Sequence, residues 1–308
     1  MIGHGTRVSS PFSACHDVSV PGGALRVARA GPPPEEADAV VLAVHGITSS
    51  LMAWRTVARD LALRPGLCLL APDLRGRGQS AALPGPYGMA RHVTDLIAVL
   101  DDAGVERAVL VGHSMGAYVV ARLAARHPER AAAVVLIDGG LKVPLPSGQD
   151  PAEVLAVAVE QSIARLGMTF DSVDDYVALW RQHPALVREW DEDVEAYARY
   201  DVAGEPGAMR CVVSDAAVEA DCRDLLCDAE TGSAVDRVRA PLDLVRAPRG
   251  LLDDDPVLPD AVVASFVAAH PGARVEEIDG ANHYTMVFGG GPGPRRIARV
   301  IEAAALRS

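Results

Sequence analysis

The chain has 308 residues, of which 49% are hydrophobic and 23% charged, proportions typical of a globular protein with a sizeable core. Its formal net charge of −12 argues against nucleic acid and anionic membrane surfaces as partners. Because no apolar run approaches the ~20 residues of a membrane span and none has the form of a secretory signal, we expect a cytoplasmic protein with reduced cysteines.

The first half of the chain alternates short apolar runs with amphipathic segments. His16–Val20 and Ala24–Ala28 flank Pro21-Gly22-Gly23 and predict a β-hairpin. Further apolar runs predict buried strands at Ala39–Val44, Leu67–Ala71, Ala108–Val111 and Ala132–Ile137. Segments between these runs predict helices at Met52–Leu63, Met89–Ala103 and Ala117–Ala125. This succession predicts βαβ units, and therefore a parallel sheet with helices on both faces.

The pattern changes from Leu141 to Ala240, where no strand followed by a crossover is evident. A Pro- and Gly-containing linker leads into helical stretches that include Ala152–Leu166 and Val173–Trp180. Aromatic residues gather here: Phe170, Tyr176, Trp180, Trp190, Tyr197 and Tyr200. Such rings either line an apolar substrate pocket or form the core of the insertion itself.

The sheet pattern resumes after the insertion. Strands are predicted at Leu242–Ala247 and Arg274–Ile278, and helices at Asp260–Ala269 and Pro294–Leu306. We therefore divide the chain into an α/β core of residues 1–140 and 241–308 and a helical insertion of residues 141–240.

Gly112-His113-Ser114-Met115-Gly116 joins a predicted strand to a predicted helix. A G-x-S-x-G sequence in this context indicates a nucleophile on a sharp strand-to-helix turn, where small neighbours let the chain reverse tightly. Ser114 is the candidate nucleophile, and the Met115 N–H would face the group that it attacks. A second N–H donor is expected where the Ala39–Val44 strand ends in His45-Gly46, and Ile47 is the candidate. We expect the His45 side chain to orient this loop.

A serine nucleophile needs a base, and the base needs an acid. His283 lies in a loop beyond the last predicted strand, where the chain order serine, acid, histidine places the base. The turn after Leu242–Ala247 has no carboxylate in the usual acid position. Asp253 is the nearest one, Asp255 lies farther out, and Asp138 ends an earlier strand. The sequence leaves Asp138 and Asp253 as equal candidates for the acid.

The loop from Asp73 to Ser80 is charged and rich in glycine, but its spacing is wrong for a nucleotide-binding turn. We expect it to be a structural loop held by salt bridges. Lys142 is the only lysine, which excludes a G-x-x-x-x-G-K phosphate loop.

Together, these motifs and the helical insertion resemble the α/β-hydrolase superfamily, within it the branch of esterases, lactonases and carbon–carbon hydrolases with a helical lid. The resemblance implies an eight-stranded, mostly parallel sheet whose second strand is antiparallel. It implies that Ser114 and His283 are nucleophile and base and that Ile47 and Met115 form the oxyanion hole. In relatives such as haloalkane dehalogenases the acid stands where Asp138 does. Those enzymes and the epoxide hydrolases use an aspartate nucleophile, which Ser114 replaces here.

The functional expectation is a serine hydrolase that cleaves an ester, lactone or thioester through an acyl-enzyme, with no cofactor and no metal. Its partner would be a small apolar substrate under the lid. Two alternatives remain open at this point. One is another chemistry on the same residues, such as carbon–carbon bond hydrolysis or cofactor-free perhydrolysis. The other is a ligand-binding protein without catalysis.

Overall fold

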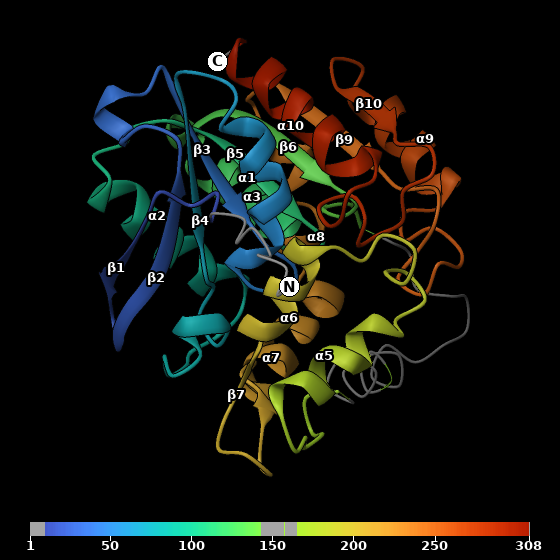
Figure 1. Cartoon of the computed structure of the whole chain (residues 1–308). Helices are drawn as coiled ribbons and strands as arrows, with labels where there is room; N and C mark the ends of the chain where they lie inside the picture. Colours follow the sequence, from blue (N-terminus) through green and yellow to red (C-terminus); the bar gives the residue numbers. More distant parts are fainter. Residues whose placement is uncertain (1–9, 143–156, 158–164, 308) are drawn as a thin grey trace.

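A computed structural model of the protein describes residues 10–142, 157 and 165–307. An eight-stranded sheet runs through the molecule in the order β1-β2-β4-β3-β5-β6-β9-β10 (Figure 1). Its strands are β1 (Ala14–Val20), β2 (Gly23–Ala30), β3 (Ala39–Val44), β4 (Leu67–Pro72), β5 (Ala108–His113), β6 (Ala131–Ile137), β9 (Leu242–Arg246) and β10 (Arg274–Glu277). β2 is antiparallel to both of its neighbours, β1 and β4. The other six strands of this sheet, β4, β3, β5, β6, β9 and β10, are parallel to one another. The predicted sheet, including its antiparallel second strand, is confirmed.

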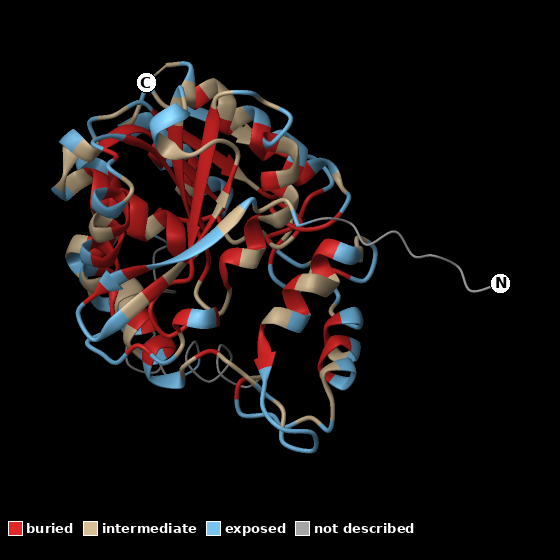
Figure 2. Cartoon of the chain, turned by 60° about the vertical axis from the view of Figure 1, so that its left-hand side comes forward, coloured by how far each residue is buried: buried red, intermediate tan, exposed pale blue. Residues whose placement is uncertain are grey.

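Helices cover both faces of the sheet and enclose two buried cores (Figure 2). On one face lie α2 (Met89–Asp102), α3 (Met115–Arg126) and α9 (Asp260–Ala269); on the other lie α1 (Arg55–Leu61) and α10 (Pro292–Ala305). Strand β3 serves both cores because successive side chains of a strand point to opposite faces. Val40, Leu42 and Val44 enter the first core, and Val41 and Ala43 enter the second. Burial on both faces explains the unbroken apolar run of this strand.

The helix expected over about Met52–Leu63 is present, but its first turn is tighter than an α-helix. The structure has a 3₁₀ turn at Leu51–Trp54 and then the short helix α1. The Leu51 N–H donates to the Asp73 carboxylate at 2.7 Å, and Trp54 is fully buried, so a tertiary contact and a large core side chain fix the tighter turn. Other 3₁₀ turns lie at Pro34–Glu36, Gly78–Ser80, Pro128–Arg130 and Val235–Arg237.

The insertion between β6 and β9 contains α5 (Val173–Arg181), α6 (Glu192–Tyr200), β7 (Val202–Ala203), β8 (Arg210–Cys211), α7 (Asp215–Cys227) and α8 (Ala229–Gly232). Helices α5, α6 and α7 lie below the sheet in Figure 1. The short pair β7–β8 was not expected. The expected helix Ala152–Leu166 lies almost wholly outside the described residues. Tyr176, Trp180 and Tyr197 are buried in the second core, so these rings pack the insertion against the rest of the molecule.

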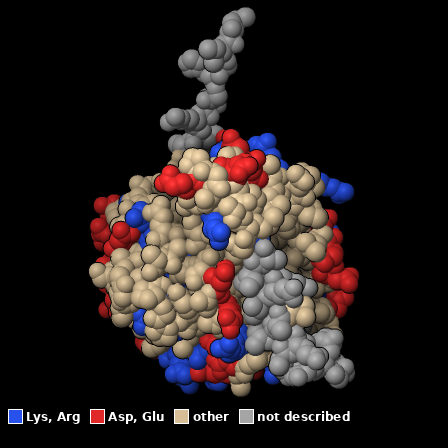
Figure 3. All heavy atoms as spheres, turned by 90° about the horizontal axis from the view of Figure 1, so that it is seen from below, with Lys and Arg blue, Asp and Glu red and all other residues tan. Residues whose placement is uncertain are grey.

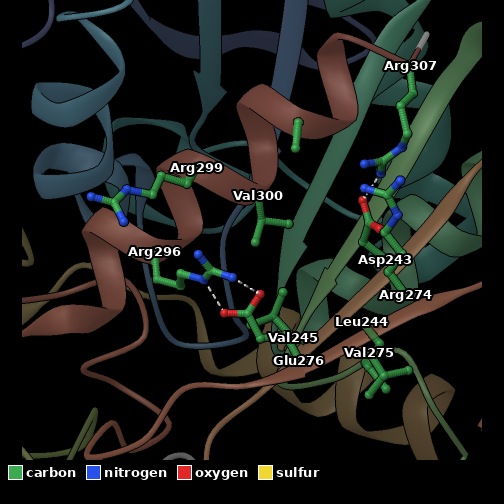
Figure 4. A pocket seen from close by; sticks show the side chains of 11 residues that line it. Asp243, Leu244, Val245, Arg274, Val275, Glu276, Arg296, Arg299, Val300 and Arg307 are labelled. Carbon is green, nitrogen blue, oxygen red and sulfur yellow. Dashed lines mark hydrogen bonds and ion pairs between the residues drawn. The ribbon is translucent and has the colours of Figure 1, made fainter.

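A cavity of about 270 Å³ lies between β9, β10 and α10 (Figure 4). Its lining includes Arg274, Arg296, Arg299 and Arg307, of which Arg296 pairs with Glu276 and Arg307 with Asp243. None of the residues considered above as site candidates lines it. On the face shown in Figure 3, acidic and basic side chains are interspersed. Within the described part of the chain, no helix has the length and apolar character needed to cross a membrane.

Candidate active site

Ser114 stands on the sharp turn between β5 and α3 with the unusual backbone angles φ 56° and ψ −123°. Its N–H donates to the carbonyl of Ile137 at 2.9 Å, which ties the turn to the end of β6. A Cβ on Gly112 would overlap the backbone of Gly116, and a Cβ on Gly116 would overlap the carbonyl of Val44. Both glycines of the motif are therefore required by close backbone approach, as a nucleophile elbow demands.

His283 is bonded to Asp138. The His283 Nδ1 atom lies 2.7 Å from Asp138 Oδ2, and the two side chains are only 4% and 0% exposed. Asp138 follows β6 with φ 46°, and its second oxygen accepts from the Ala247 N–H at 3.2 Å. The end of β6 thus directs one carboxylate at one imidazole. Of the two acids that the sequence left open, the structure brings Asp138 to the histidine ring.

Asp253 lies near the same loop but contacts a different residue. It pairs with Arg249 and accepts a hydrogen bond from Asn282 Nδ2 at 3.0 Å. The hydrogen bond from Asn282, together with Arg249, lowers the pKa of Asp253. Within the described residues, Asp253 makes no hydrogen bond to the His283 ring, and Asp255 is exposed. Asp253 therefore holds the loop that carries His283, through the residue before it.

Ser114 and His283 reach the same edge of the sheet. The His113 and His283 rings lie with their centroids 4.7 Å apart, and His113 Nε2 donates to the carbonyl of His283 at 2.9 Å. Burial lowers the pKa of His113 well below its usual value, so this ring is neutral. The residue before the serine therefore packs directly on the candidate base. Ser114 Oγ itself makes no hydrogen bond with any other residue that the structure describes.

The loop from His45 to Ser50 lies beside the serine; a Cβ on Gly46 would be 3.2 Å from Ser114 Cβ. His45 Nδ1 donates to the Gly46 carbonyl at 2.8 Å, and its Nε2 accepts from the Leu74 N–H at 3.0 Å. Burial lowers the pKa of His45 to about 3, so the ring is neutral and orients the loop, as expected. The N–H groups of Ile47 and Met115 donate to no other described residue.

The comparisons with known proteins agree with this fold. Residues 39–190 match the family described as alpha/beta hydrolase fold. The structure of E-2-(acetamidomethylene)succinate hydrolase superposes with a TM-score of 0.75 at 22% identity, covering 94% of this chain and 98% of that one. The thioesterase domain from the curacin biosynthetic pathway superposes with a TM-score of 0.74 at 20% identity, covering 94% and 99%. The chain has the fold of the α/β-hydrolase superfamily.

Two curated relatives of this chain come from Mycobacterium tuberculosis. Lipase LipV is 40% identical over 114 residues, which is 37% of this chain and 41% of the lipase. Epoxide hydrolase B is 31% identical over 250 residues, which is 77% of this chain and 65% of that enzyme. In both cases the match spans less than two thirds of the relative's length.

Three residues around the candidate site were not predicted as part of it: Arg165, Asp221 and Asn282. Asn282 bridges Asp253 and the Ala185 carbonyl of the insertion at 2.8 Å. The Asp73–Ser80 loop was correctly predicted to be salt-bridged, through Arg75 with Asp95 and Arg77 with Asp221. The charged composition of the loop predicted that salt bridges form there, but it could not predict their partners, which lie 20 and 144 residues farther along the chain. No group of three or more His, Cys, Asp or Glu in the described ranges is arranged to hold a metal ion.

Proposed function

We propose that the protein is a serine hydrolase that cleaves a carboxylic ester, lactone or thioester through an acyl-enzyme, without a cofactor. The observation that carries this proposal is the buried 2.7 Å contact between His283 and Asp138 at the same sheet edge as the strained Ser114 turn. A carboxylate on Nδ1 fixes the imidazole tautomer that leaves Nε2 able to accept a proton.

The proposed reaction begins when His283 Nε2 takes the hydroxyl proton of Ser114 and Oγ attacks the substrate carbonyl carbon. The negative oxygen of the tetrahedral intermediate accepts hydrogen bonds from the Ile47 and Met115 N–H groups. The intermediate collapses as His283 returns the proton to the leaving alcohol or thiol. Water, activated by the same histidine, then releases the acid and restores Ser114. Asp138 stabilises the imidazolium in both halves of the reaction.

Residues 141–240 are proposed as a lid over this site, with a small apolar substrate beneath it. In support, described parts of the insertion contact both candidate loops. The Ala185 carbonyl accepts from Asn282, beside the proposed base, and Arg165 donates to the Thr48 carbonyl at 3.4 Å, beside the proposed oxyanion donor. The insertion thus contacts both loops that would surround the substrate.

Epoxide hydrolysis is not favoured, although an epoxide hydrolase is among the relatives. Serine attack on an epoxide would give an ether, which activated water does not cleave readily. An acyl-serine ester, by contrast, has a carbonyl that water attacks. The serine at the elbow therefore favours acyl transfer.

The test is covalent labelling with a fluorophosphonate, followed by assays on p-nitrophenyl esters, thioesters, lactones and β-diketones. We expect wild-type protein to be labelled at Ser114 and to hydrolyse at least one acyl substrate. Ser114→Ala should lose labelling and turnover while keeping the wild-type circular dichroism spectrum. Wild-type turnover by Ser114→Ala would overturn the proposal. Cleavage of β-diketones alone would assign the site to carbon–carbon bond hydrolysis instead.

A further inference from the structure

The carbonyl of Ile47, next to the proposed oxyanion donor, is held by a fully buried guanidinium. Arg77 Nε donates to this carbonyl at 2.9 Å, and its Nη1 donates to the Arg75 carbonyl at 2.9 Å. The third nitrogen of the fork, Nη2, lies 2.5 Å from Asp221 Oδ2. Both charged side chains are 0% exposed.

Asp221 reaches Arg77 from helix α7 of the insertion. Its two oxygens lie 3.1 and 3.0 Å from His92 Nε2, so it faces both a guanidinium and an imidazole. Burial by itself would raise the pKa of Asp221, but His92 and Arg77 outweigh burial and lower it to about 2. The carboxylate is therefore ionised at neutral pH and neutralises Arg77 inside the protein.

The Ile47 N–H and C=O belong to adjacent peptide groups that share one Cα atom. Holding the carbonyl removes most of the freedom of the N–H, because only two backbone dihedrals separate the groups. The next carbonyl, of Thr48, accepts from Arg165, which in turn pairs with Asp201 of the insertion at 2.7 Å. Two consecutive carbonyls of this loop are thus bound by arginines whose acidic partners come from the insertion.

We propose that Arg77 and Asp221 are positioning residues for the oxyanion hole. Asp221 of the insertion fixes the Arg77 fork, and Arg77 fixes the Ile47 peptide so that its N–H faces the developing negative charge. This inference rests on the proposed function and extends it, since it makes the insertion part of the transition-state machinery rather than only a cover. A donor fixed before the reaction costs no reorganisation during it.

Arg75 lies in the same Asp73–Ser80 loop as Arg77, and with Asp95 of α2 it offers a matched control pair. Arg75 and Asp95 form a bidentate ion pair at 2.8 and 3.0 Å, and both side chains are 1% exposed. The Arg75 side chain also donates to the carbonyls of Pro84 and Pro21, and it makes no hydrogen bond or ion pair with the described His45–Ser50 loop. Loss of this pair should cost stability as loss of Arg77–Asp221 does, without moving the oxyanion donor.

The experiment compares Asp221→Asn with Asp95→Asn on the best p-nitrophenyl ester and on its thionoester, in which sulfur replaces the carbonyl oxygen. We expect Asp221→Asn to lower kcat on the oxoester by about tenfold to a hundredfold, a fraction of the ~10²–10³ that losing a whole donor costs. KM should stay within about twofold of wild type, because the contact acts in the transition state. Sulfur accepts weaker hydrogen bonds, so the oxoester-to-thionoester rate ratio should also fall. Asp95→Asn should retain the wild-type kcat and ratio.

Arg77→Lys serves as the second variant, for the case in which Asp221→Asn does not fold. It keeps a positive charge opposite Asp221 but removes the Nε donor to Ile47, so kcat and the rate ratio should fall as in Asp221→Asn. Equal kcat losses in the Asp221 and Asp95 variants, or an unchanged rate ratio in Arg77→Lys, would overturn the inference and leave the proposed function standing. Absence of wild-type labelling at Ser114 would instead overturn the proposed function itself.

Discussion

The Asp138 carboxylate divides its two oxygens between a side chain and the backbone. Oδ2 meets His283, and Oδ1 accepts from the Ala247 N–H, at the end of the neighbouring strand β9. The Asp138 N–H donates to the Val245 carbonyl at 2.8 Å, so the residue is held at three atoms. Its φ of 46° is one that aspartate adopts more readily than most residues. These contacts give the carboxylate one orientation, toward the imidazole.

The Asp138→Asn substitution should reduce turnover far more than Asp253→Asn. The first change keeps the side chain's shape but presents a neutral amide to His283, which favours the wrong tautomer and leaves the imidazolium uncompensated; we expect kcat to fall by roughly 10²–10⁴-fold. Asp253→Asn should lower kcat by less than about tenfold, because Asp253 acts through Asn282. Steady-state kinetics on one p-nitrophenyl ester checks both. Equal, small losses would mean that neither carboxylate is the acid.

At the scale of elements, the site depends on how closely β3, β5, β6 and α3 approach one another. Gly116, in the first turn of α3, faces the carbonyls of Val44 and His45 at the end of β3. Gly139, after β6, faces the backbone of Ser114. The serine turn is therefore enclosed by backbone on two sides, which holds its positive φ against the strain of that conformation.

Gly116→Ala should destabilise the protein by about 1–3 kcal/mol, because a Cβ there must displace the end of β3. Urea denaturation followed by circular dichroism measures the loss. Gly272→Ala is the matched control, since a Cβ at Gly272 meets no heavy atom within 4 Å and the residue has no positive φ. A Gly116→Ala variant as stable as Gly272→Ala would contradict the close packing of the elbow.

Across the whole molecule, buried charges join the insertion to the core. Asp193 of α6 lies 2.9 Å from Arg55 and 2.8 Å from Arg59 of α1. Tyr200 donates to the Asp73 carboxylate at 2.6 Å, and burial raises the pKa of Asp73 to about 6. Together with Asp221, these contacts place carboxylates at several junctions between insertion and core. Stability of the assembled molecule should therefore depend on pH.

The contribution of Asp221 has a defined sign. The pKa of Asp221 is 3.8 in the unfolded chain and about 2 in the folded protein. Between about pH 2 and pH 3.8 the unfolded chain therefore binds more protons at this residue than the folded protein does. The stabilisation is present above about pH 4 and is lost as the pH falls toward about 2, in total about 2 kcal/mol. The stability difference between wild type and Asp221→Asn, from urea unfolding, should shrink by that amount over this interval. Other titrating groups, such as Asp73, are present in both proteins, so their contributions cancel in this difference. A stability difference that stays constant with pH would refute the lowered pKa of Asp221.

The sequence by itself determined the layers, the positions of the core strands and the serine turn. Each of these has a local cause: unbroken apolar runs for strands buried on both faces, and glycines where backbones approach. It also placed His283 beyond the last strand, because chain order constrains the base in this fold. The sequence did not predict the 3₁₀ turn at Leu51–Trp54, because its geometry depends on a contact between Leu51 and Asp73, which lies 22 residues farther along the chain.

Only the tertiary structure decided which aspartate meets the histidine and what holds the loops. Asp138 and Asp253 are both acidic residues after strands, and nothing local separates a carboxylate that points at His283 from one that points at Asn282. Arg77 has two such distant partners: Asp221 lies 144 residues farther along the chain, and Ile47, whose carbonyl it binds, lies 30 residues before it. The direction of a side chain and its long-range partners follow from the packing of the whole chain. A pattern of neighbouring residues therefore does not predict them.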